Sequence, residues 1–60
     1  MFVIWNPEAR KYVSQPGSRS SYTAKLELAR TYPTKEAAER ECCDNERVRS
    51  VADIMAGSFR

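Results

Sequence analysis

The chain has 60 residues, of which 42% are hydrophobic and 30% charged, and its formal net charge is +2. A chain of this length buries only about 60% of the surface that its unfolded form exposes, so it has room for one domain, residues 1–60, and none for a deep enclosed pocket. The composition excludes a disordered or low-complexity protein, and no apolar run reaches the roughly 20 residues that a membrane-spanning helix needs.

The N-terminal third of the chain predicts a β-hairpin followed by a loop. Residues 2–5 are a run of β-forming residues that ends at the turn opener Asn6-Pro7, and a second run follows at residues 11–13. Residues 14–21 have the composition of a loop, with a strong turn signal at Pro16-Gly17.

The segment from Tyr22 to Tyr32 carries two competing patterns. Apolar residues alternate with polar ones at period two, which favours a strand, yet residues 24–30 are good helix formers. We expect a short strand near Leu28–Tyr32, preceded by irregular chain or a helical turn.

A helix is the clearest element, and we expect it to span Lys35 to Asp44. Thr34 is a good N-cap, and Asn45 suits a left-handed stop. At about 100° per residue the inward face is made of small side chains, which lets the helix lie close to a sheet. That face holds Ala38, Cys42 and Asn45, and the opposite face holds Glu36, Glu39, Arg40, Cys43 and Glu46.

Residues 47–51 predict a final strand. The spacing of Val51, Ile54 and Met55 indicates a turn or a short helix after it, with Ser50 as the cap. The predicted fold class is therefore α+β: a small antiparallel sheet, made of the N-terminal hairpin and one or two further strands, packed on one helix in the order ββ(β)αβ.

The sequence lacks the residues on which most enzymes depend. It has no histidine, which removes the commonest general base and metal ligand, and it has no glycine-rich loop to hold a phosphate. Cys42 and Cys43 are adjacent, so they close no useful loop and cannot supply the four ligands of a structural zinc site. We expect no enzymatic activity, no metal and no cofactor, in an intracellular chain without a signal peptide.

Three surfaces are candidates for binding a partner, and the first is aromatic. Because residues 2–5 are apolar on both strand faces, Val3 and Trp5 should point away from the helix. Tyr12 from the neighbouring strand would join them, and exposed aromatic side chains are typical of binding hot spots. The alternative is that the loop and C-terminal residues cover this face as core: Ile54, Met55 and Phe59.

The second candidate surface is the acidic outer side of the helix. Residues 36–46 carry five acidic groups against a single basic one, Arg40. Glu36 and Glu39, together with Glu46, would complement a basic partner surface, such as one that normally holds nucleic acid. The alternative is that these carboxylates only keep the domain in solution.

The third candidate surface is basic and would bind nucleic acid. Basic residues interleaved with aromatic ones can follow a nucleic-acid backbone and stack on its bases. The alternative is scattered solubilising charge, because the acidic helix would repel phosphate. The residues concerned are Arg10, Lys11, Arg19 and Arg30, with Lys25 among them.

One pattern resembles that of short phage and prophage proteins built from a β-hairpin, a further strand and a helix. It consists of Lys11-Tyr12-Val13 and, after a gap, Leu28-Ala29-Arg30-x-Tyr32-Pro33-Thr34-Lys35-Glu36-Ala37-Ala38-Glu39, with an aromatic-x-Thr-x-x-x-Ala entry to the helix. Such proteins include anti-CRISPR and other host-takeover inhibitors, which block the surface of a host protein stoichiometrically. The resemblance implies a phage origin and a protein partner.

The leading hypothesis is a small inhibitor of a host protein or nucleoprotein complex in the bacterial cytoplasm, with Trp5 and Tyr12 as apolar anchors and Glu36 and Glu39 as charge complements. A nucleic-acid-binding accessory protein that uses the basic residues is the alternative. A homodimer joined through the Trp5 face is a third hypothesis.

Overall fold

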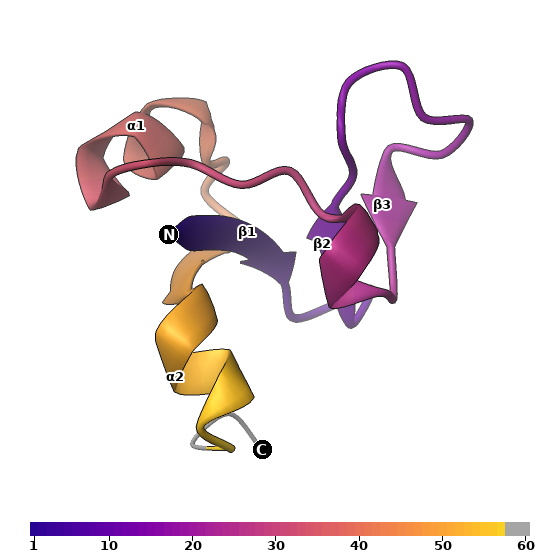
Figure 1. Ribbon diagram of the computed structural model, residues 1–60. Coiled ribbons are helices and arrows are strands. Elements are labelled where there is room, and N and C mark those ends of the chain that lie inside the picture. Colours follow the sequence, from indigo (N-terminus) through magenta and orange to yellow (C-terminus); the bar gives the residue numbers. More distant parts are fainter. Residues whose placement is uncertain (58–60) are drawn as a thin grey trace.

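The N-terminal run of β-forming residues makes the predicted hairpin, strands β1 (Phe2–Asn6) and β2 (Lys11–Val13), in a computed structural model that describes residues 1–57 (Figure 1). Asn6 shapes the turn between them. Its Oδ1 accepts hydrogen bonds from the backbone N–H groups of Glu8 (3.0 Å) and Ala9 (3.1 Å). This is the local bonding through which asparagine favours turns over strand interiors.

Two further strands complete an antiparallel sheet in the order β3-β2-β1-β4. Strand β4 (Arg47–Ser50) pairs with β1 along four residues, from Phe2↔Ser50 to Trp5↔Arg47. Strand β3 (Tyr22–Thr23) pairs with β2 on the other side of the sheet. The predicted α+β fold, with its elements in the order ββ(β)αβ, is confirmed.

The third strand lies earlier in the chain than predicted. The strand expected at Leu28–Tyr32 is wrong, while the helical turn expected before it is present as η1 (Leu26–Leu28). Residues 29–32 form only isolated bridges, from Ala29 to Ser14 and from Tyr32 to Phe2. They do so because β1 and β2 pair at only two positions, and this segment fills the gap where the two strands diverge.

Helix α1 (Lys35–Glu41) begins where the sequence predicts and ends three residues early. The Oγ1 of Thr34 caps it by accepting a hydrogen bond from the Ala37 backbone N–H at 3.1 Å. At the other end Cys42 is already extended (φ −78°, ψ 128°), and Asn45 does not adopt the left-handed conformation that we expected. The physical reason is that residues 42–46 must return the chain to β4.

The short helix α2 (Val51–Met55) follows β4 directly, as the spacing of its apolar residues predicts. Ser50 occupies the N-cap position without a side-chain hydrogen bond to the helix. The chain is instead tied back to its start, because the Val51 backbone N–H donates to the Met1 carbonyl oxygen at 2.9 Å. No helix within residues 1–57 is long and apolar enough to cross a membrane.

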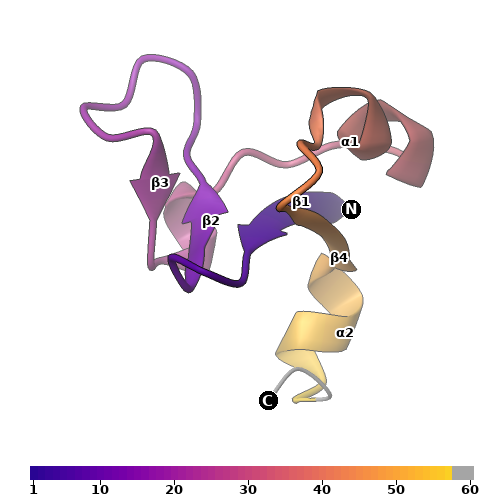
Figure 2. The same ribbon diagram turned by 180° about the vertical axis from the view of Figure 1, so that it is seen from behind.

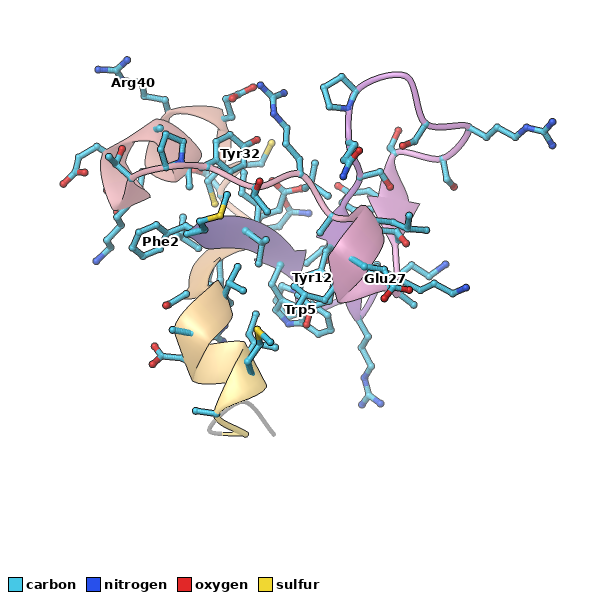
Figure 3. The ribbon with its side chains drawn as sticks, in the orientation of Figure 1. Phe2, Trp5, Tyr12, Glu27, Tyr32 and Arg40 are labelled. Carbon is cyan, nitrogen blue, oxygen red and sulfur yellow. The ribbon has the colours of Figure 1, made fainter. Side chains whose placement is uncertain are left out.

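The sheet is apolar on both faces, and each face has its own cover. On one face Ile4 packs against Ala38 of α1 and against Tyr32. On the other face Val3 and Tyr12 pack against Ala29, with α2 and η1 around them. Figure 3 shows the two sides, with Tyr32 toward α1 and with Trp5 and Tyr12 toward α2.

We predict that Ala38→Leu lowers the free energy of unfolding by about 1–3 kcal/mol, because this side chain is fully buried where α1 meets the sheet. Ala52→Leu, on the exposed side of α2, should change stability by less than about 0.5 kcal/mol. Urea unfolding followed by circular dichroism measures both variants. Equal stability of the two would contradict the close approach of α1 to the sheet.

Candidate functional site

A buried carboxylate joins the two edges of the sheet. Glu46, only 6% exposed, precedes β4 at one edge and accepts a 2.7 Å hydrogen bond from the hydroxyl of Tyr22, which lies in β3 at the other edge. A second bond comes from the Cys43 backbone N–H at 3.0 Å. The expectation that Glu46 lies on the outer acidic surface is therefore wrong.

Strand register explains why Glu46 points inward. Ile4 pairs with Val48, so Val48 and the residue two positions before it share the α1 face of the sheet. Val13 pairs with Tyr22, which puts the Tyr22 ring on that same face. The hydrogen bond to Glu46 raises the pKa of Tyr22 above its ordinary value of 10.0, because an ionised phenol would lose this donor.

We predict that Tyr22→Phe lowers the free energy of unfolding at pH 7 by about 2 kcal/mol, because the Glu46 carboxylate stays buried and loses a charged hydrogen bond. In a Glu46→Gln background Tyr22→Phe should lower the free energy of unfolding by less, because the uncharged amide loses a weaker hydrogen bond than the carboxylate does. Denaturant unfolding of the double-mutant cycle measures the coupling, and a coupling of zero would show that the hydrogen bond does not stabilise the fold.

We also predict that the stability advantage of the wild type over Tyr22→Phe depends on pH. Because folding raises the pKa of Tyr22, the advantage is fully present below the unfolded value of 10.0 and is lost as the pH rises through the folded pKa. Burial also raises the pKa of Tyr32, but both proteins contain this residue, so its contribution cancels in the comparison. Melting temperatures of both proteins between neutral and strongly alkaline pH measure the effect, and a constant difference would refute it.

The acidic side of α1 faces outward as predicted. Glu36 and Glu39 are both exposed, whereas Glu41 forms an ion pair with Arg30 at 3.3 Å. Arg40 also points away from the sheet (Figure 3). Two of the predicted carboxylates are therefore displayed on one short helix, while Glu46 is withdrawn into the fold.

The aromatic pair belongs largely to the core. The ring centroids of Trp5 and Tyr12 lie 4.9 Å apart, but Tyr12 is only 6% exposed and Trp5 is half-buried. Val51 and Ile54 pack over this face. Tyr12 is therefore a core residue, as the alternative interpretation of this surface expected. Met55 stays 77% exposed, and Phe59 lies outside the described residues.

The basic residues proposed for nucleic-acid binding do not form one stripe. Arg10 and Lys11 lie at the start of β2, and Arg19 lies in the loop that leaves its other end (Figure 1). Arg30 is turned toward the protein, where it pairs with Glu41 and sits 5.1 Å from the centroid of the Tyr32 ring. The structure thus keeps Arg10 and Lys11 together but places Arg19 and Arg30 elsewhere.

The two cysteines are free thiols, and their surroundings make them less acidic. Burial raises the pKa of Cys42, and the negative charge of Glu46 raises the pKa of Cys43. The raised pKa values disfavour the thiolate, which is the reactive form, at neutral pH. Within residues 1–57 no group of three or more metal-ligating side chains is gathered.

Two hollows of about 380 Å³ each lie on the surface. One lies between α1 and β4, beside the exposed Glu39, with Cys42 and Val48 as its apolar lining. The other lies between η1 and α2 and is more apolar, with Leu26, Val51 and Met55 in its wall. The sequence did not predict the hollow between α1 and β4. This hollow forms where the C-terminal end of α1, which lies earlier in the chain than predicted, meets the edge of the sheet.

Comparison of this chain with protein-family models, with curated proteins and with solved structures found no match.

Proposed function

We propose that this chain is a binding protein that inhibits a host protein or nucleoprotein complex by occupying its surface, in the manner of phage inhibitors such as anti-CRISPR proteins, in the cytoplasm of a bacterial host. The observation that carries the proposal is the exposure of Glu36 and Glu39 on a helix that packs against the sheet through the buried Ala38. Exposed carboxylates of this kind complement a basic surface that would otherwise hold nucleic acid.

The size of the chain also supports a surface function. A standard protein interface buries about 800 Å² of each partner, which is roughly a fifth of the 4475 Å² of accessible surface here. A partner bound at α1 therefore covers a whole side of the domain. Stoichiometric occlusion needs no deep pocket, and it suits a domain whose small core leaves no room for an enclosed one.

We predict that Glu36→Lys combined with Glu39→Lys abolishes capture of the partner while leaving the fold intact, because both side chains are exposed. Lysine in the first helical turn should cost no more than about 1 kcal/mol through the helix dipole. The measurement is a pull-down from a bacterial host lysate in which a stoichiometric partner is quantified for each variant.

The matched control is Glu8→Lys with Glu27→Lys, which changes the net charge equally at exposed sites away from α1. It should capture the partner as the wild type does. Undiminished capture by the α1 variant would remove this surface from the proposal. The nucleic-acid-binding alternative instead predicts salt-sensitive retardation of nucleic acid by the purified wild-type chain.

A further inference from the structure

The sheet has an open edge at β4. Among residues 1–57 this strand pairs with β1 alone, and it is the last strand of the sheet. Figure 2 shows β4 on the near side of the molecule, with α1 above it, α2 below it and neither helix across it. An edge strand of this kind directs the N–H and C=O groups of alternate residues outward, where another extended chain can pair with them.

The α1 face of this edge has a place for a side chain. The hollow between α1 and β4 lies beside Val48, with Cys42 as a second apolar neighbour. Its remaining lining is charged and consists of Lys35 and Glu39 on the helix and Glu46 and Arg47 on the strand side. In a strand added next to β4, every second side chain would point to this face. A medium-sized apolar side chain suits this position, since the hollow is open and partly apolar.

The opposite face of the edge is basic. Arg47 and Arg49 lie two residues apart, so both belong to the face of Trp5 and Val3, with which they pair. Both are exposed. The guanidinium of Arg47 donates to the carbonyl oxygens of Asp44 (3.2 Å) and Glu46 (2.9 Å).

These arginines determine which strand can pair with the edge. A second copy of β4 could add symmetrically in two antiparallel registers that join three residues of each strand, with Val48 or Arg49 opposite itself. The first register puts Arg47 opposite Arg49, and the second puts Arg49 opposite Arg49. Like charges directly opposite each other destabilise a strand pair, so the edge is protected against self-association.

We propose that β4 is the docking edge for an extended segment of a partner protein in which acidic residues alternate with apolar ones. The segment adds as a fifth strand, with its carboxylates beside Arg47 and Arg49 and an apolar side chain in the hollow by Val48. Backbone hydrogen bonds supply the affinity, and the alternating side chains supply the specificity. Glu39 borders both this docking edge and the acidic side of α1, but the inference rests on β4 and not on the function proposed above.

The probe is a short capped peptide of alternating glutamate and valine, titrated into the full chain and followed by amide NMR. The backbone amide signals of β4 should shift. A peptide with lysine in place of glutamate should bind on the order of tenfold more weakly, because two cross-strand charge pairs change from attraction to repulsion. In the Arg49→Glu variant the preference for glutamate over lysine should diminish or reverse.

Two N-methylated versions of the glutamate–valine peptide test the strand geometry. One is methylated at every glutamate nitrogen and the other at every valine nitrogen. Because a docked strand turns only alternate N–H groups toward its neighbour, one version should keep its affinity and the other should lose it. The proposal is overturned if the two methylated versions behave equally or if the glutamate and lysine peptides bind with equal affinity. It is also overturned if the parent peptide does not bind at millimolar concentration.

Discussion

The buried carboxylate of Glu46 is the constraint on which the rest of the structure depends. A carboxylate removed from water is costly unless hydrogen bonds satisfy it, and here the Tyr22 hydroxyl and the Cys43 backbone N–H do so. These two bonds fix three parts of the chain at once: strand β3 through Tyr22, the turn after α1 through Cys43, and the start of β4. In a domain whose core is this small, these hydrogen bonds position chain segments that apolar burial alone would not fix.

Local sequence signals predicted those elements that local chemistry determines. The β-forming run from Phe2 to Trp5, the Thr34 cap and the small inward Ala38 each depend on neighbours in the chain, and the structure confirms all three. It also confirms that β1 is apolar on both faces, because that follows from alternation alone.

The errors concern contacts between residues distant in sequence. Glu46 continues the helical spacing of the outer acids, yet it also continues the period-two pattern that leads back from Val48. Choosing between the two periods required the position at which α1 ends, and a partner 24 residues away, Tyr22, contributes to that choice. Strand β3 was likewise missed because only two residues form it, and its place is set by pairing with β2.

The inward turn of Glu46 also explains how opposite charges come to occupy separate surfaces. Glu46 is the immediate neighbour of Arg47, but successive residues of a strand point to opposite faces, so its carboxylate lies on the α1 face and Arg47 belongs to the other face. Glu46 is bonded to Tyr22, whereas Arg47 and Arg49 are exposed on β4 and Glu36 and Glu39 are exposed on α1. The exposed charges of the sequence are therefore distributed over separate parts of the surface, acidic on α1 and basic on β4.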